Sequence, residues 1–446
     1  MIMLPLFLIV ILSLFVLYSV RFMIKRGHDL HALAFFILYV YTIFAQIGYA
    51  YFPELSDVVG AYFGPNLFYK YWVFMFFSFV FTFLLYRFMN PKNEKKNAYI
   101  VKSANLNYGE YLFFLIVILI YIGLNLYFNT YRNLFGYGGG NTLGGPWFGI
   151  GFWIFTLCTF ILYTIFRDKS NKIKKRIFSL LIFLLCIVFF LKVTIAAGTR
   201  SAIFYFFLSL TFYELFPIIK TIKYQKRKIF ILMAAGFLVI SILTTLRALR
   251  SQEDNISFSS IYNFDSNDSI YSDEDLSALI LFQDYYLPSH TLFISIYYDI
   301  VDPVEVLKSN FANSLVMLKY PFLTTTILNR GFGTDLERGV GWAYHYFVEG
   351  YNASGFFGIF YNALFWNLGM LLWIRLTQSN NKRHNKSMLA ISVLVIVSVM
   401  KSQNSAFIQF YWLILIPGLA LLLLANNSKI AFYRSCLLYT SPSPRD

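Results

Sequence analysis

The chain has 446 residues, of which 58% are hydrophobic and 13% charged, and its mean hydropathy is +0.60. This composition leaves too little polar surface for a soluble fold and indicates an integral membrane protein. The net charge of +15 does not indicate a nucleic-acid partner, because the basic residues stand in short runs between apolar segments, as in cytoplasmic connectors.

Eleven apolar stretches are long enough, or nearly so, to cross a bilayer as helices of about 20 residues. The first carries its positive charges behind it, so we interpret it as an uncleaved span rather than a secretory signal. The sequence therefore predicts an all-α polytopic membrane protein. The expected spans are 2–20, 30–51, 71–88, 110–127, 147–166, 177–197, 200–219, 229–246, 354–374, 387–400 and 406–425.

Lysine and arginine residues predict the orientation of these spans. One alternate set of short connectors carries 25 of them, and the opposite set carries 5. Basic connectors stay in the cytoplasm. We therefore expect the amino terminus and the long polar interval to lie outside, and the carboxyl end inside.

The long polar interval, residues 247–353, holds 14 of the 22 acidic residues and 6 of the 37 basic ones. We predict a bundle of about eight spans at 1–246, a large extracytoplasmic loop with short helices and the active site at 247–353, and about three spans at 354–434. The tail at 435–446, SCLLYTSPSPRD, resembles the translation of a sequencing adapter and is left out of the fold prediction.

Two stretches of the interval have alternative interpretations. The acidic run at 273–275 lies in a segment rich in Ser and Asn, and is either a solvated loop or a divalent-cation site. The stretch at 311–328 is apolar enough to touch the membrane. Because Lys319 and Pro321 stand in its middle, we expect an interfacial or re-entrant helix rather than a twelfth span.

Three groups of basic residues emerge on the predicted external side. Arginine suits phosphate because its planar fork makes bidentate, charge-assisted hydrogen bonds and stays charged. For Arg247 and Arg250 there is an equal alternative, in which each side chain only reaches the lipid headgroups or pairs with a local carboxylate. The groups are Lys192 with Arg200, Arg247 with Arg250, and Arg330 with Arg338.

A cluster of polar and aromatic residues precedes the predicted span at 354–374. If the segment is helical, their spacing of 4, 3, 4 and 3 puts them on one face. Such a face has what a general base beside a sugar hydroxyl needs, although an interfacial helix with its polar side in water is the alternative. We expect no metal site, because HxxxE supplies only two ligands. The residues are Arg338, Trp342, His345, Glu349 and Asn352.

Two short patches resemble the bacterial O-antigen and capsule repeat-unit polymerases, the Wzy-like membrane glycosyltransferases, and more distantly the O-antigen ligases. AAGTRSAIF is similar to that family's short G-S/T-R turn between two spans. YHYFVEGYNASGFFGIF is similar to its E-x-Y-x-N-x-x-G-x-x-G region. The span pattern extends the resemblance over most of the chain, but only these patches match at residue level.

The resemblance implies a GT-C-like polymerase in the bacterial cytoplasmic membrane that joins polyprenyl-pyrophosphate-linked oligosaccharides on the extracytoplasmic face. Membrane lipids and a chain-length regulator would be its other partners, and no cofactor or metal is expected. By this resemblance Arg200 matches the arginine of the short turn, and Glu349, Tyr351 and Gly355 match the later patch. Here Asn352 follows the tyrosine directly rather than after a gap.

We assign roles on this basis. Glu349 or His345 would be the base that takes the acceptor's proton. The cations would neutralise the departing pyrophosphate, and three further residues would bind glycan. The cations are Arg200, Lys192, Arg330, Arg338, Arg247 and Arg250, and the glycan residues are Trp342, Tyr351 and Asn352.

Two other functions fit the same architecture. An O-antigen ligase would share the chemistry but use another acceptor. A flippase or transporter of lipid-linked oligosaccharide should instead place polar residues at the bundle midplane on several helices. Apart from Lys192, the charges here collect at the outer lip, which favours external chemistry.

Overall fold

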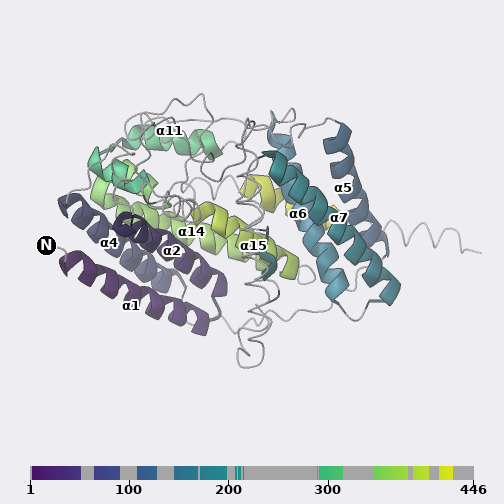
Figure 1. Cartoon of the computed structure of the whole chain (residues 1–446), viewed down its shortest axis with the longest axis horizontal. Coiled ribbons are helices and arrows are strands. Elements are labelled where there is room, and N and C mark those ends of the chain that lie inside the picture. Colours follow the sequence, from purple (N-terminus) through teal and green to yellow (C-terminus); the bar gives the residue numbers. More distant parts are fainter. Residues whose placement is uncertain are drawn as a thin grey trace, which may run out of the picture. The chain divides into compact units, whose positions relative to one another are not determined.

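The computed structural model describes the chain in separate stretches, within which every regular element is a helix and no strand occurs (Figure 1). The prediction of an all-α chain is confirmed for this part. The predicted span at 229–246, most of the one at 200–219 and the tail at 435–446 lie outside it. The described stretches are 3–51, 65–90, 108–127, 145–168, 171–197, 291–314, 345–379, 385–400 and 411–424, with isolated positions at 206–207, 209–211, 214 and 289.

Four of the described helices are long and apolar enough to cross a membrane. Their outward faces are apolar too: in α1 (Met3–Lys25), Val10, Leu14 and Leu17 repeat at helical spacing and are each more than half exposed. Such a stripe in contact with water is unfavourable, so it indicates a lipid-facing surface. The number of spans and their orientation stay predictions. The four candidate spans are Phe7–Lys25, Leu67–Met89, Gly109–Tyr127 and Val348–Leu376.

The described helices fall into two compact units. The first holds α1, α2 (Asp29–Tyr51), α4 (Pro65–Met89), α11 (Pro303–Ser314), α13 (Val348–Ser354), the 3-10 turn η5 (Gly355–Phe357), α14 (Gly358–Ser379) as far as Ile374, and the end of α15 (Asn385–Met400) from Leu394. The second holds α5 (Tyr108–Tyr127), α6 (Gly145–Arg167), α7 (Ile173–Ala197), the remaining parts of α14 and α15, and the π-helical turn η6 (Tyr411–Leu415).

In the first unit, α1 packs on α2 and α4 (Figure 1), and aromatic side chains join α4 to each of the other two helices. Phe83 of α4 meets Phe15 of α1 edge to face at 5.6 Å and Phe22 of α1 at 5.5 Å. Phe79 of α4 meets Phe35 of α2 in the same way at 5.0 Å. Edge-to-face pairs add about 0.5–1.5 kcal/mol to the burial of the rings. The three helices therefore form one tightly packed layer.

Helix α14 packs on this layer through one aromatic contact with α2 and one polar contact with α4. Trp366 lies 6.0 Å from Phe35, measured between ring centroids. The Nδ2 atom of Asn367, which is fully buried, donates to the Thr82 carbonyl of α4 at 3.0 Å and to the Ala363 carbonyl of its own helix at 2.8 Å. An amide in an apolar helix is stable when it bonds across to a neighbour. The chain segment that precedes α14 is thereby held beside α2 and α4.

A short helical segment, residues 291–297, leads into α11 through a turn. The turn is a Schellman motif, with N–H groups of Asp299 and Ile300 bonded to the carbonyls of Ile296 (3.4 Å) and Ser295 (2.9 Å). Asp299 holds the left-handed position at φ 46°, where glycine is usual. Asp302 then begins α11, since its Oδ1 accepts the Glu305 N–H at 3.0 Å.

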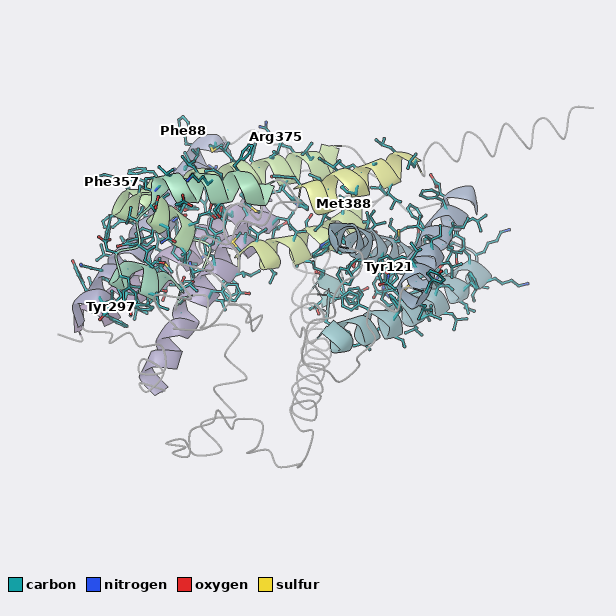
Figure 2. All side chains as sticks on the ribbon, turned by 90° about the horizontal axis from the view of Figure 1, so that it is seen from above. Phe88, Tyr121, Tyr297, Phe357, Arg375 and Met388 are labelled. Carbon is teal, nitrogen blue, oxygen red and sulfur yellow. The ribbon has the colours of Figure 1, made fainter. Side chains whose placement is uncertain are left out.

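The second unit is built on α5, α6 and α7, whose packing is also aromatic. Tyr121 of α5 stacks on Phe155 of α6 at 5.1 Å, and Phe155 meets Phe189 of α7 at 5.6 Å (Figure 2). A Cβ at Gly151 would lie 2.8 Å from the Tyr121 ring, so the glycine admits this stacking. At one end of α6, Arg167 makes two hydrogen bonds of 2.7 Å with Glu214.

Candidate functional site

The candidate site is the segment from His345 into α14, which carries the second patch that resembles the polymerases. The single helix expected through His345 is wrong at residues 345–347, where the chain forms a turn, and α13 begins at Val348. The cause is local: His345 Nδ1 accepts the Phe347 N–H at 3.2 Å, which competes with helical bonding. Glu349 and Asn352 do share α13, as predicted, and both are buried within the protein.

His345 is fully buried, and both ring nitrogens are used within the first unit. Since Nδ1 accepts from Phe347, Nε2 carries the proton and faces Thr42 Oγ1 of α2 at 3.1 Å. Burial lowers the pKa of His345 to about 3, although a hydrogen bond with the Leu38 carbonyl acts in the opposite direction. The ring is therefore neutral at pH 7. This geometry favours a role in fixing the turn over the predicted role as a base, which stays a prediction.

Glu349 is 1% exposed, and its carboxylate belongs to a chain of three polar side chains. The Tyr361 hydroxyl of α14 donates to Glu349 Oε1 at 3.0 Å, and the same hydroxyl accepts a hydrogen bond from Asn310 Nδ2 of α11. A tyrosine that accepts one bond donates a stronger one, because hydrogen bonds in a chain polarise each other. The arrangement holds the Glu349 carboxylate in one orientation.

Tyr351 and Asn352 tie α13 to the turn before α11. The Tyr351 hydroxyl donates to Asp299 Oδ1 at 3.0 Å. Asn352 Nδ2 donates to the Ile300 carbonyl at 2.7 Å, and the Asn352 carbonyl accepts the Asp302 N–H at 2.8 Å. Asn352 Oδ1 is buried and has no hydrogen-bond partner among the described residues. Both side chains therefore brace the site, and their predicted glycan contacts stay predictions.

Three glycines allow α13 and α14 to meet at short range. A Cβ at Gly350 would overlap the Asn362 side chain, whose Nδ2 donates to the Phe347 carbonyl at 3.0 Å. A Cβ at Gly358 would overlap the Gly350 backbone. Gly355 caps α13 at φ 59°, a conformation that other residues rarely adopt. The G-x-x-G part of the patch thus has a packing explanation: the first glycine turns the chain and the second admits the backbone contact.

The structure does not describe the side chains of the predicted cations. Six of the predicted residues lie outside the described part of the chain, and Lys192 belongs to α7 in the second unit, with its side chain outside the description. The predicted convergence on a pyrophosphate stays a prediction. The six are Arg200, Arg247, Arg250, Arg330, Arg338 and Trp342.

Sequence reasoning missed four residues that make hydrogen bonds within the candidate site. Tyr361 and Asn362 stand inside the predicted span at 354–374, and polar side chains inside a span are a signal for function that was not used there. Asn310 had no local signal, because it precedes an apolar stretch and looks like a solvated residue. Asp299 could not be assigned to the site either, because the residue type alone does not reveal the left-handed turn that brings it to Tyr351.

Over the described residues, no group of three or more His, Cys, Asp or Glu side chains is placed to hold a metal ion. The acidic run at 273–275 lies outside them. Comparisons with protein-family models, with curated proteins and with solved structures found no match. The geometry around Glu349 is therefore the structural basis for a functional proposal, and the resemblance to the polymerases stays an expectation from two patches.

Proposed function

We propose that the chain is a membrane glycosyltransferase that polymerises polyprenyl-pyrophosphate-linked oligosaccharide repeat units into surface polysaccharide. In this proposal the protein has about eleven spans with a GT-C-like architecture and works at the extracytoplasmic face of a bacterial cytoplasmic membrane. One observation carries it: a buried carboxylate, Glu349, stands at the amino end of a candidate span within the patch that resembles the polymerases. A buried, oriented carboxylate there suits a base more than a surface charge.

The reaction assigns one step to this carboxylate. Glu349 takes the proton of the acceptor sugar hydroxyl while that oxygen bonds to the anomeric carbon of the donor. The bond from this carbon to the pyrophosphate oxygen breaks, and the polyprenyl pyrophosphate leaves with the electron pair. Tyr361 keeps Oε1 of the carboxylate in place by its hydrogen bond, which fixes the orientation of the group that takes the proton. The predicted arginines would balance the charge on the leaving group.

The burial of Glu349 adds a requirement. At 1% exposure the carboxylate does not meet bulk water. The acceptor therefore reaches it only when substrate binding displaces a covering segment. Closing a site of this kind excludes water and prevents hydrolysis of the donor.

The test is polymerisation by purified protein in nanodiscs with a defined polyprenyl-pyrophosphate oligosaccharide, with and without a chelator. We expect a ladder of products that the chelator does not change. Glu349→Gln keeps the shape of the side chain but cannot accept the proton, so turnover should fall by roughly 100-fold or more. The control is Glu305→Gln on α11, where the carboxylate is paired with Lys308 at 2.6 Å near the surface, and its turnover should equal that of the wild type.

A melting temperature measured on the same samples separates catalysis from structure. If Glu349 only holds helices together, Glu349→Gln melts earlier and turns over normally once folded, which would contradict the proposal. Transfer of the glycan to an acceptor that is not a polyprenyl-linked repeat unit, without a ladder, would identify a ligase instead. Movement of intact substrate across liposomes without any new glycosidic bond would identify a transporter.

A further inference from the structure

Helix α11 has its polar side inside and its apolar side outside. Ser309 is 2% exposed and Asn310 9%, whereas Leu307 is 64% exposed and Phe311 71%. Val304, at 58%, completes the outward stripe at helical spacing. We call Val304, Leu307 and Phe311 the α11 stripe. A helix on a water-soluble surface has the opposite pattern, with its apolar stripe against the core.

The inward side of α11 is held by specific polar contacts. The Asp302 N–H bonds to the Asn352 carbonyl at the start of the helix, at 2.8 Å. Asn310 Nδ2, about two turns later, bonds to the Tyr361 hydroxyl of α14. The earlier residue of α11 is thus bonded to the earlier residue of the partner segment, and the later to the later. Helix α11 therefore runs in the same direction as the chain from α13 into α14. The α11 stripe cannot turn inward without breaking these bonds.

The α11 stripe is continuous with the exposed apolar face of a candidate span. Val301, just before α11, is 41% exposed and lies 3.7 Å from a Cβ built at Gly355. The exposed apolar side chains that follow Gly355 are Phe356 at 40%, Phe357 at 77% and Phe360 at 56%, and Phe357 is labelled in Figure 2. All three are part of the candidate span Val348–Leu376. One apolar surface therefore covers the outside of both elements.

We propose that α11 is embedded in the bilayer leaflet in which the span Val348–Leu376 begins, with the α11 stripe against lipid acyl chains. Leaving these three side chains in water would be unfavourable, whereas contact with acyl chains removes them from it. The charged residues of the helix agree with this position. Lys308 is exposed at the border of the stripe, from which its long side chain reaches the headgroups, and it is paired with Glu305 at 2.6 Å. This inference rests on the membrane character of the chain and not on the proposed function.

The experiment is fluorescence quenching on the full chain in nanodiscs. Leu307 and Phe311 are replaced by cysteine one at a time in a Cys436→Ser background and carry a bimane label. Cys158 and Cys186 are buried, and labelling of the chain without an introduced cysteine gives the background. Leu14→Cys, on the outward face of α1, is the lipid control, and Lys174→Cys, exposed at the start of α7, is the water control. Lipids with brominated acyl chains quench from the membrane, and iodide quenches from water.

We expect both α11 labels to be quenched by brominated lipid as strongly as the label at Leu14, and hardly by iodide. Quenching by iodide at the level of the Lys174 label would place α11 in water and overturn the proposal. Quenching by neither, together with cross-linking between protein copies through the same cysteines, would show that a second copy covers the stripe and would also overturn it. Neither Leu307 nor Phe311 is part of the core, so substitution by cysteine should change the stability of the fold little.

Discussion

At the scale of single residues, Asp299 has an unfavourable backbone conformation that is explained by the contact of its side chain with Tyr351. Glycine is the residue that costs least at the left-handed position of a Schellman motif, and aspartate there carries a backbone penalty. What the aspartate adds is a carboxylate oxygen that accepts the Tyr351 hydroxyl. The strained position is thus explained by a contact with α13, which would be lost with glycine.

Tyr351→Phe should lower the free energy of unfolding by about 1.5–3 kcal/mol, because the hydroxyl bonds to a charged acceptor. Thermal unfolding in nanodiscs measures the change. Tyr39→Phe is the matched control, since its hydroxyl bonds to a neutral acceptor, Ser13 Oγ, at 2.6 Å. It should cost only about 0.5–1.5 kcal/mol. Equal losses in the two variants would mean that Asp299 does not act as a charged acceptor.

His345 predicts a pH dependence of stability. The unfolded chain takes up a proton at this ring near pH 6.5, whereas the folded ring does so only near pH 3. Between these values the unfolded state binds more protons, so the free energy of unfolding falls as the pH drops from 6.5 towards 3, by up to about 1.4 kcal/mol per pH unit. Above this window the ring has no effect.

Melting temperatures of the wild type and His345→Gln at pH 7 and pH 5 check this. Glutamine offers both an acceptor for the Phe347 N–H and a donor for Thr42, but it does not titrate. The variant should lose less stability between the two pH values than the wild type. The same loss in both proteins would show that His345 is not buried in its neutral form.

Residue types point to part of the candidate site. Glu349 and Asn352 stand out because charged and amide groups next to an apolar span are costly unless they have a function or a partner, and Tyr351 stands out through the resemblance to the polymerases. Their partners were not found, because Asn310 and Asp299 reach the site only through the folded turn before α11. Pairings between residues about 40 or more positions apart have no local signal in one sequence.

At the scale of elements, the contact between Gly350 and Gly358 connects α13 to α14 through backbone rather than side chains. The expected span at 354–374 therefore missed the true boundary. A hydropathy window ends where polar residues collect, yet α13, η5 and α14 form one candidate span from Val348 to Leu376. Glu349 and Asn352 are thus part of this candidate span and not of a loop before it.

Gly358→Ala should destabilise the protein by about 1–3 kcal/mol or more, because the added methyl group meets the Gly350 carbonyl, which cannot move aside as a side chain can. Thermal unfolding and the yield of folded protein report the effect. Gly123→Ala on α5 is the control: no atom lies within 4 Å of its Cβ position, so alanine should stabilise the helix by about 0.5–1 kcal/mol. A neutral Gly358→Ala variant would contradict the close approach of α13 and α14.

At the scale of the whole molecule, the apolar spacing of the sequence predicted the helices well, since a run of about 20 apolar residues has only one stable form in lipid. The expected stretches at 30–51 and 110–127 end within a residue or two of α2 and α5. The division of the described helices into two units was not predicted. It depends on which helices exchange contacts, as Asn367 does with Thr82, and periodicity does not contain that information.

Orientation in the membrane is the prediction that belongs to this scale. Lys70 and Lys174 are exposed at the starts of α4 and α7, and the charge bias predicts them on opposite sides of the membrane. A membrane-impermeant maleimide applied to intact cells should label Lys70→Cys directly, and Lys174→Cys only after permeabilisation. The reverse pattern would invert the topology and would place Glu349 on the cytoplasmic side.

The overlap that a side chain would cause between Gly358 and Gly350 has a mechanical consequence. With backbone against backbone, α13 and α14 pack at close range beside Glu349. On the other side, α11 is connected to the same carboxylate through Asn310 and the Tyr361 hydroxyl. If α11 lies in the leaflet as proposed, a change in bilayer thickness acts on this hydrogen-bonded chain, so turnover should depend on the acyl-chain length of the surrounding lipid.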